Sequence, residues 1–187
     1  MKNVEIDNRK KDLRGRMKIR RAQERGGDGA IAENFLSLSE IQDKKVFFVY
    51  HSFGTEADTM PAIDGLFARE KTVLLPRVEG RDMVAVPYEK GALLHAGAYG
   101  IFEPSGQAYA GKVDVVVLPL LAADARGGRL GYGGGYYDRY LSDATAGKAL
   151  KIGYCYDFQV VEDACADERD VPLDIIVTDK RIIRVHA

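Results

Sequence analysis

The stretch VDVVVLPLLAADARGGRLGYGGGYYDRYL, residues 113–141, decides the fold that we expect for this chain. Its first part, VDVVVLPLL (113–121), is an apolar run typical of a strand that is covered on both faces. A glycine-rich turn follows, and helical spacing then runs over 135–150. A buried strand, a glycine turn and a helix in this order indicate a parallel sheet with helices packed on it.

Further short runs rich in Val, Ile and aromatic residues predict strands in the rest of the chain. They are VFFVYH (46–51), TVLLP (72–76), MVAVPY (83–88), KIGYCY (151–156) and DIIVTD (174–179). Helical spacing lies between several of them, as at Thr59–Lys71, and a helix is expected over Asp28–Ile41 after the Gly26-Gly27 break. We therefore expect one domain over residues 1–187. Its fold would be a three-layer α/β/α arrangement with a mostly parallel, Rossmann-like sheet and room for an antiparallel edge.

The composition is that of a folded protein rather than a fibrous, disordered or membrane-spanning one. The 187 residues are 46% hydrophobic and 29% charged, with a net charge of −1. No segment reaches the ~18 consecutive apolar residues of a membrane span, and the first residues lack the apolar core of a signal peptide. We expect a cytoplasmic protein in which Cys155 and Cys165 are reduced, because their spacing fits neither a zinc site nor a redox pair.

A basic segment lies near the start of the chain. Between Arg9 and Arg25 there are nine Lys and Arg residues and two Asp and Glu residues. On a helix, one narrow arc would carry Lys10, Arg14, Lys18, Arg21 and Arg25, with Leu13 and Met17 beside it to dock on a core. Three interpretations of this N-terminal basic helix stay open: a solvated face, a polyphosphate site or an RNA site.

The glycine-rich turn is a candidate phosphate site. Glycines permit positive φ and a close approach of ligand to backbone, and the helix start that follows presents free N–H groups. The turn does not match a P-loop, and Tyr136 stands where the GxGxxG pattern needs a glycine, so tight-turn packing is the alternative. Asp138, in the first helical turn, could hold Mg²⁺ beside phosphate oxygens.

Other polar residues lie near the ends of predicted strands. Glu56 and Asp58 are either carboxylates at a helix start or ligand contacts, and His51 fits a structural role better than a catalytic one. Asp170 fits turn chemistry or a second metal ligand. We find no Ser/His/Asp or Cys/His arrangement that would indicate a covalent nucleophile.

LPLLAADARGGRLGYGGGYYDRYL contains the pattern RLGxGxGYYD, and it resembles the signature of the 5-formyltetrahydrofolate cyclo-ligase family, also called methenyltetrahydrofolate synthetase. Five further segments resemble parts of that family in the same order: KKDLRGRMKIR, YHSFGTEADT, LPRV, YGIFEP and DVPLDIIVTD. The chain departs from the family pattern at Ala123, where Phe is common, at Gly134, where some members carry Lys, and at Arg169, where many carry His.

The resemblance implies an enzyme that uses ATP and Mg²⁺ to cyclise 5-formyltetrahydrofolate to 5,10-methenyltetrahydrofolate, with release of ADP and phosphate. ATP would phosphorylate the N-formyl oxygen, N10 would attack the activated carbon, and phosphate would leave as the ring closes. Phosphoryl transfer needs aligned and neutralised charge more than a protein nucleophile.

The resemblance also assigns residues to each ligand. For ATP it implies Lys10, Arg14, Arg129, Leu130, Gly131, Tyr132, Gly133, Gly134, Gly135, Tyr136 and Tyr137. For the folate it implies His51, Glu56, Tyr132, Gly133, Gly134, Gly135 and Tyr136, with Glu56 on the pterin ring. For Mg²⁺ it implies Asp138 and Asp170.

Two other functions remain open from the sequence. A non-catalytic regulatory module of the same fold would bind nucleotide and folate without turnover. A sugar-phosphate isomerase would need a catalytic carboxylate and a sugar-phosphate loop, which we do not find. We expect a small-molecule substrate, no nucleic-acid or membrane partner, and a monomer or a weakly associated dimer.

Overall fold

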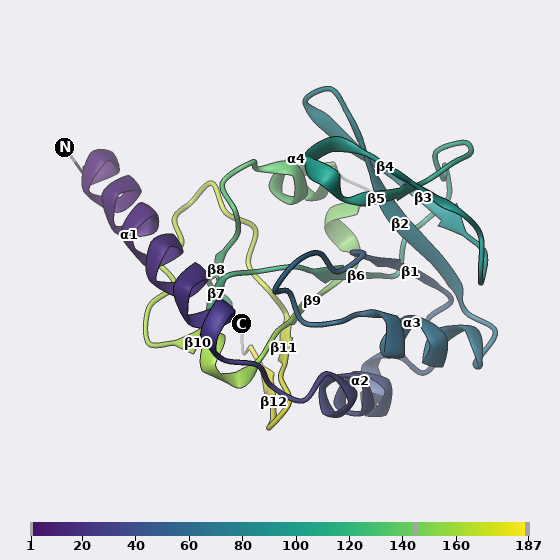
Figure 1. The fold of residues 1–187 in the computed structure, drawn as a ribbon, viewed down its shortest axis with the longest axis horizontal. Coiled ribbons are helices and arrows are strands. Elements are labelled where there is room, and N and C mark those ends of the chain that lie inside the picture. Colours follow the sequence, from purple (N-terminus) through teal and green to yellow (C-terminus); the bar gives the residue numbers. More distant parts are fainter. Residues whose placement is uncertain (1, 144–145, 186–187) are drawn as a thin grey trace.

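The structure is a computed structural model that describes residues 2–143 and 146–185. A seven-stranded sheet in the order β12-β11-β9-β6-β1-β2-β3 forms its centre (Figure 1). The strands are β1 (Val46–Val49), β2 (Thr72–Glu79), β3 (Asp82–Tyr88), β6 (Val115–Leu118), β9 (Leu150–Tyr154), β11 (Ile175–Val177) and β12 (Ile182–Arg184). Neighbours from β11 to β2 pair in parallel, whereas β3 and β12 pair antiparallel. The mostly parallel sheet is confirmed, with an antiparallel strand at both edges.

Helices cover both faces of this sheet. On one face lie α2 (Asp28–Ser37), the 3-10 turn η1 (Ser39–Ile41) and α3 (Met60–Phe67), and on the other lies α4 (Tyr136–Ser142). Successive strand residues point to opposite faces. Phe47 and Val115 therefore join the core under α2 and α3, while Phe48 and Val116 join the core under α4. The three-layer α/β/α arrangement is confirmed.

Several predicted elements are shorter than the sequence indicated. The helix expected over Thr59–Lys71 is α3, Met60–Phe67, and the helix expected over Asp28–Ile41 ends at Ser37, before the 3-10 turn η1. The strand expected over 113–121 is regular only in β6, and Pro119, which has no N–H to donate, follows its last residue. The helix expected over 135–150 ends at Ser142 because the backbone of Asp143 is extended, with φ −65° and ψ 134°. Residues 144–145 lie outside the described part of the chain, and the 3-10 turn η3 (Ala146–Lys148) then leads into β9.

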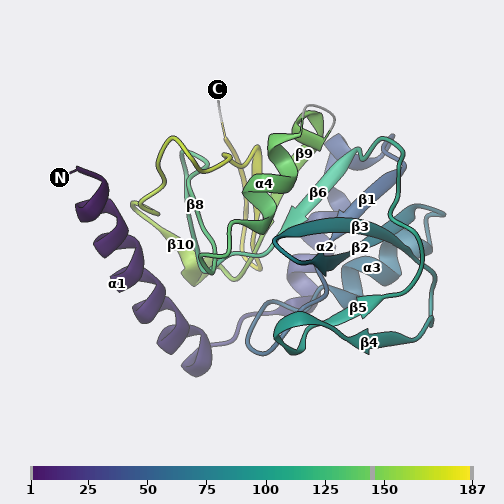
Figure 2. The same ribbon diagram turned by 90° about the horizontal axis from the view of Figure 1, so that it is seen from above.

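Two small sheets extend the fold. The first contains β7 (Ala122–Asp124), β8 (Arg129–Leu130) and β10 (Val160–Val161), with the 3-10 turn η4 (Asp157–Gln159) before β10. The second is the hairpin of β4 (Leu94–Ala96) and β5 (Phe102–Pro104), joined through the 3-10 turn η2 (Ala98–Gly100). Figure 2 shows α1 (Lys2–Gln23) beside β8 and β10, with the β4–β5 hairpin on the opposite side of the molecule.

Helix α1 docks on the first small sheet through its apolar residues. Leu13 and Met17 are buried there against Leu121, Leu130 and Cys165. The predicted docking of the basic helix through Leu13 and Met17 is therefore confirmed.

The turn from α1 to α2 is closely packed. A Cβ atom on Gly26 would collide with the Tyr156 ring and would come within 2.9 Å of Asp179 Oδ2. The Arg25 guanidinium lies 5.8 Å from the centroid of the same Tyr156 ring. The direction in which α1 leaves the body of the protein therefore depends on a residue without a side chain.

Candidate functional site

The candidate site lies beyond the carboxyl ends of β1 and β6, which are neighbours at the centre of the sheet. Ligands of open α/β sheets bind at this edge. The chain leaving β1 carries His51 and Glu56. The chain leaving β6 passes through β7 into the glycine-rich loop, residues 129–135, whose first two residues form β8. The sequence therefore brings the two predicted groups of site residues to one end of the sheet.

The glycine-rich loop requires its glycines for two different reasons. Gly133 and Gly135 have φ values of 101° and 66°, which residues with a side chain rarely adopt. At Gly134 the limit is space, because a Cβ atom there would lie 2.9 Å from the Tyr136 ring. The expected positive φ is confirmed at two of the three adjacent glycines.

Lys10 of α1 is buried in a cluster of opposite charges. Its Nζ lies 2.8 Å from Asp167 Oδ2 and 2.5 Å from Asp170 Oδ2. Burial lowers the pKa of Lys10, but the hydrogen bonds to both carboxylates outweigh burial and the pKa is raised. Hydrogen bonds from Arg169 and Lys10 hold the pKa of Asp167 well below its usual range. This cluster ties α1 to the segment that carries Asp170.

The other four basic residues of the predicted arc fall into two groups. Arg14 Nε donates to the Gly131 carbonyl oxygen at 2.9 Å, and Arg21 is buried with 4% of its surface exposed. Lys18 is exposed, and so is Arg25, which lies beyond the end of α1 at Gln23 and therefore outside the predicted helical arc. The interpretation of the basic stripe as a solvated face is therefore wrong for Lys10 and Arg21, which both point into the protein.

The two predicted metal ligands lie in adjoining parts of the site. Asp138 Oδ1 lies 2.5 Å from Arg129 Nη2 and accepts the backbone N–H of Val171 at 3.3 Å. Because Val171 follows Asp170, the fold brings the two carboxylates toward each other, and both are ion-paired. No group of three or more His, Cys, Asp or Glu that could hold a metal occurs in the described residues.

Arg129 adds a donor without an acceptor. Its side chain is 4% exposed, and its Nε has no hydrogen-bond partner among the described residues. Arg129 and Asp170 also line a cavity of about 500 Å³ between the β7–β8 turn and residues 163–172. A buried guanidinium with an unused N–H beside a cavity is an environment that favours acceptor oxygens.

Asp124 is a buried carboxylate in the lining of this cavity. Asp124 Oδ1 accepts the N–H groups of Arg126 at 3.0 Å and Gly128 at 3.2 Å, and Asp124 Oδ2 accepts that of Ala164 at 2.9 Å. It thereby joins the turn before Arg129 to the segment that leads to Asp167. This role of Asp124 was not predicted, although Asp124 lies within the stretch that resembles the family signature. No sequence pattern pointed to Asp167.

Glu56 lies on the other side of the site. Its Oε2 accepts the backbone N–H of Phe53 at 2.9 Å. Burial raises the pKa of Glu56, and hydrogen bonds from Tyr132 and Phe53 together with the charge of Arg21 offset this only in part. His51 is half-buried, its ring lies 6.3 Å from that of Phe102, and burial lowers its pKa.

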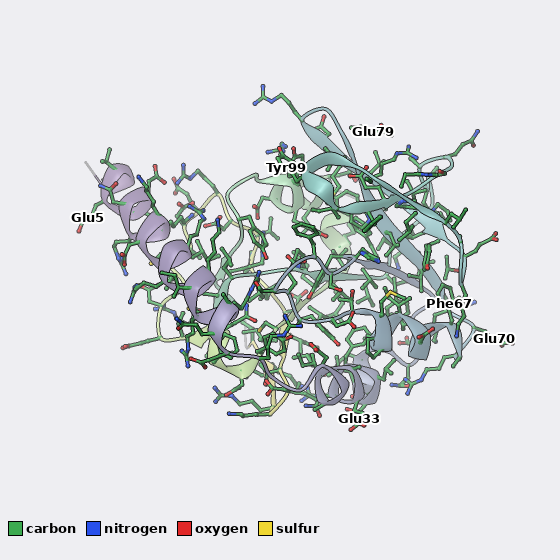
Figure 3. All side chains as sticks on the ribbon, viewed as in Figure 1. Glu5, Glu33, Phe67, Glu70, Glu79 and Tyr99 are labelled. Atoms are coloured by element: carbon green, nitrogen blue, oxygen red, sulfur yellow. The ribbon has the colours of Figure 1, made fainter. Side chains whose placement is uncertain are left out.

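Exposed aromatic side chains lie on the same side of the site as Glu56 and His51. Phe53, Tyr99, Phe102 and Tyr132 are exposed large residues of this region. Tyr99, labelled in Figure 3, lies at the end of the β4–β5 hairpin near α4, and its hydroxyl is 3.1 Å from that of Tyr136. This side of the site therefore offers flat apolar surfaces around one carboxylate.

Two of the residues assigned to ATP belong to the packing beneath the loop. Leu130 is 1% exposed in the core under α1. The Tyr137 ring lies 6.0 Å from that of Phe48, and burial raises its pKa. Any contact of Leu130 with a ligand would therefore come mainly from the backbone, whereas the side chain of Tyr137 is only partly buried.

Comparison with known proteins decides the family. Residues 3–179 match the 5-formyltetrahydrofolate cyclo-ligase family. The chain belongs to this family. The expected enzyme class, a ligase of folate one-carbon chemistry, is thereby confirmed.

Individual cyclo-ligases match most of the chain. The 5-formyltetrahydrofolate cyclo-ligase of Escherichia coli is 34% identical over 141 residues, which cover 72% of this chain and 78% of that relative. That of Haemophilus influenzae is 30% identical over 163 residues, with 83% and 87% covered. The NMR structure of Aquifex aeolicus 5,10-methenyltetrahydrofolate synthetase has a TM-score of 0.81 at 34% identity, covering 95% and 93% of the two chains. None of the helices described here is both long and apolar enough to cross a membrane.

Proposed function

We propose that the protein converts 5-formyltetrahydrofolate and ATP to 5,10-methenyltetrahydrofolate, ADP and phosphate. One observation carries the proposal: a single loop contacts both halves of the site. Gly131 accepts a hydrogen bond from Arg14 of the basic helix. The next residue, Tyr132, lies close enough to Glu56 beyond β1 to lower the pKa of that carboxylate. A reaction between a polyphosphate and a folate requires both to lie side by side, and this loop is placed to touch both.

In this proposal ATP lies between α1 and the glycine-rich loop. Lys10 and Arg14 would contact its phosphates, and residues 129–137 would wrap around it. The cavity of about 500 Å³ beside Arg129 is lined by the β7–β8 turn and residues 163–172 rather than by α1, and it shares Arg129 and Asp170 with the proposed phosphate end of the site. Its volume is within the range of small-molecule sites. The cations at Arg129 and at Arg14, which lies beside Gly133, fit a ligand rich in acceptor oxygens.

Asp138 and Asp170 would hold Mg²⁺. Two carboxylates without a third fit an ion that keeps water and phosphate oxygens among its ligands. When bound, Mg²⁺ neutralises charge on the transferred phosphoryl group. Lys10 and Arg129, which pair with these carboxylates in the structure, could then pair with phosphate oxygens, so that the number of unpaired charges would not rise.

The folate would occupy the aromatic side. Glu56 would accept hydrogen bonds from N–H groups of the pterin ring, His51 would line the pocket, and residues 132–136 would face the reacting formyl group. The γ-phosphoryl group would pass to the formyl oxygen, N10 would attack the formyl carbon, and phosphate would leave as the ring closes. Each step needs alignment and charge stabilisation, and none needs a protein nucleophile.

We further propose that residues 1–187 form one domain that acts as a monomer or weakly associated dimer in the cytoplasm, with no nucleic-acid partner. The three hydrophobic clusters support the first point, because each draws on residues from well-separated parts of the chain.

The test is an absorbance assay with purified protein, Mg²⁺, ATP and 5-formyltetrahydrofolate. We expect ATP-dependent growth of the near-ultraviolet band of the methenyl product, and its loss when EDTA removes Mg²⁺. Arg16→Met, which changes a side chain 68% exposed on the outer face of α1, should match the wild type. A protein that binds both ligands without forming product would contradict the enzyme and support the regulatory module.

A further inference from the structure

Arg21 is a buried cation that none of the ligand contacts proposed above uses. It is 4% exposed on the inner face of α1. Its Nε donates to Thr55 Oγ1 at 3.1 Å, its Nη1 to the Leu120 carbonyl oxygen at 3.3 Å, and its Nη2 to the Tyr132 hydroxyl at 2.6 Å. One guanidinium thus joins the segment beyond β1, the segment beyond β6 and the glycine-rich loop.

Arg21 reaches Glu56 by two routes. The Tyr132 hydroxyl accepts from Arg21 and lowers the pKa of Glu56, and its single proton is left to be donated towards that carboxylate. The second route is through the backbone, because Thr55 directly precedes Glu56. The Arg21 guanidinium also lies 5.5 Å from the centroid of the Tyr132 ring, which restricts that ring.

We propose that Arg21 is a positioning residue that holds Glu56 and Tyr132 in the orientation that binds the folate. The inference rests on the proposed function and deepens it, because it adds a residue to the folate side. Arg21 lies on the same helix as Lys10 and Arg14, so α1 would serve both substrates: directly for ATP, and through Tyr132 for folate. Lys10 is anchored separately by Asp167 and Asp170, so loss of Arg21 should affect the folate first.

The charges around Glu56 give this role a measurable signature. The ionisable groups that act on it or respond to it are Arg21 of α1, Tyr132 of the loop, Tyr50 after β1 and Tyr137 of α4. Burial raises the pKa of Glu56, whereas the Tyr132 hydroxyl and the Arg21 charge lower it. Removing either group should raise this pKa. Folate binding that needs the ionised carboxylate would then be lost at a higher pH as the solution is acidified.

The experiment compares Arg21→Met, Tyr132→Phe, the double variant and the matched control Arg16→Met. Steady-state assays give kcat and the KM of each substrate, and the folate KM is followed from pH 5 to pH 8. We expect each single variant to raise the folate KM about tenfold, because each breaks a chain of hydrogen bonds to a charged group. The ATP KM should change by less than about twofold. The rise in folate KM at acid pH, which we call the acid limb, should begin at a higher pH than in the wild type.

The double variant tests whether the two residues act together. Because both substitutions break the same link, the double variant should be little worse than either single one, whereas independent contributions would multiply to about 100-fold. Circular dichroism shows whether each variant is folded. If Arg21→Met does not fold, Tyr132→Phe decides alone, since it removes the same link at a residue that is 44% exposed.

Two results would overturn the inference. One is a Tyr132→Phe variant with an unchanged folate KM and an unchanged acid limb. The other is an equal rise in both KM values, which would indicate only a structural role for Arg21. A wild-type protein without turnover would instead contradict the proposed function, whereas active wild type with unaffected variants would contradict the role of Arg21 alone.

Discussion

The two halves of the site handle charge in opposite ways. The charged half consists of Lys10, Arg129, Asp138, Asp167 and Asp170, and the aromatic half consists of Glu56 with Phe53, Tyr99, Phe102 and Tyr132. In the charged half each carboxylate touches a cation directly, at 2.5 to 2.8 Å. In the aromatic half the guanidinium of Arg21 acts on Glu56 through a tyrosine hydroxyl.

The difference teaches what each half is suited to bind. Direct ion pairs can be exchanged for pairs with an incoming polyphosphate and its metal, so a charged ligand can enter without leaving charges unpaired. A carboxylate among aromatic rings, with its pKa raised by burial, is instead suited to a flat neutral ring that donates hydrogen bonds. Substitutions in the two halves should therefore affect different kinetic constants.

Asp138→Asn should give the largest effect. Removing one negative charge weakens Mg²⁺ binding, and we expect kcat to fall on the order of 100-fold, with partial recovery at high Mg²⁺. The fold should persist, because the Asn carbonyl oxygen can still accept from Arg129 and Val171. Turnover measured across a Mg²⁺ titration checks this, with Asp12→Asn on the outer face of α1 as control. Normal turnover at limiting Mg²⁺ would remove Asp138 from the metal site.

Glu56→Gln should change the aromatic half alone. We expect the folate KM to rise about tenfold while the ATP KM stays near its wild-type value, because a charged acceptor becomes a neutral one. The acid limb of folate binding should also disappear, since burial places the raised pKa of Glu56 in control of that limb. Initial rates at several pH values provide the measurement. An acid limb that survives the substitution would assign the limb to another group.

Arg14→Ala tests the charged half with a smaller effect. Arg14 is half-buried and donates to Gly131, so its contribution is partly screened by water. We expect the ATP KM to rise about fivefold and the folate KM to rise less. Substrate titrations of wild type and variant measure both constants. The reverse order of the two changes would move Arg14 to the aromatic half.

Acid stability gives the smallest expected effect. The pKa of Asp167 is held low by Arg169 and Lys10, so the stability that it contributes is present above its unfolded pKa and is lost as the pH falls through the lower, folded pKa. The wild-type Tm should therefore drop by several degrees as the pH falls from about 5 to about 3. Asp167→Asn should lower the Tm by a few degrees at neutral pH and flatten this decline. Thermal scans at several pH values measure this. If Tm declines equally steeply with falling pH in the wild type and in Asp167→Asn, the ion pair does not stabilise the native state.

The sequence predicted the layers of the fold well and the ends of its elements less well. Apolar runs such as VFFV and VVVL can be recognised in the sequence as central strands because both faces of such a strand must be buried. Phe47 and Phe48 indeed face different cores. The end of α4 was missed because the extended backbone of Asp143 leaves no mark in hydrophobic spacing. Two antiparallel edges also carry no distinct pattern, since an edge strand alternates in either direction.

The site was predictable where one motif contains it and not where distant segments meet. The signature led to Asp138 and Arg129, but the partners of Lys10 lie 157 and 160 positions away. Helical spacing placed Arg21 on the same arc as Lys10 and Arg14, which was the available signal for it. Spacing shows a shared face but not the partner that the face meets, so the bond from Arg21 to Tyr132 could come only from the structure.

The closely packed turn at Gly26 fixes the orientation of α1 relative to the rest of the protein. Lys10 lies 13 residues before Gln23, where α1 ends shortly before Gly26, and this is about 20 Å along a helix at 1.5 Å per residue. A small rotation at this turn is multiplied over that length into a displacement of the lysine. A methyl group at residue 26 would collide with Tyr156 and Asp179 and shift α1. The expected result is that Lys10 is displaced from the proposed nucleotide site.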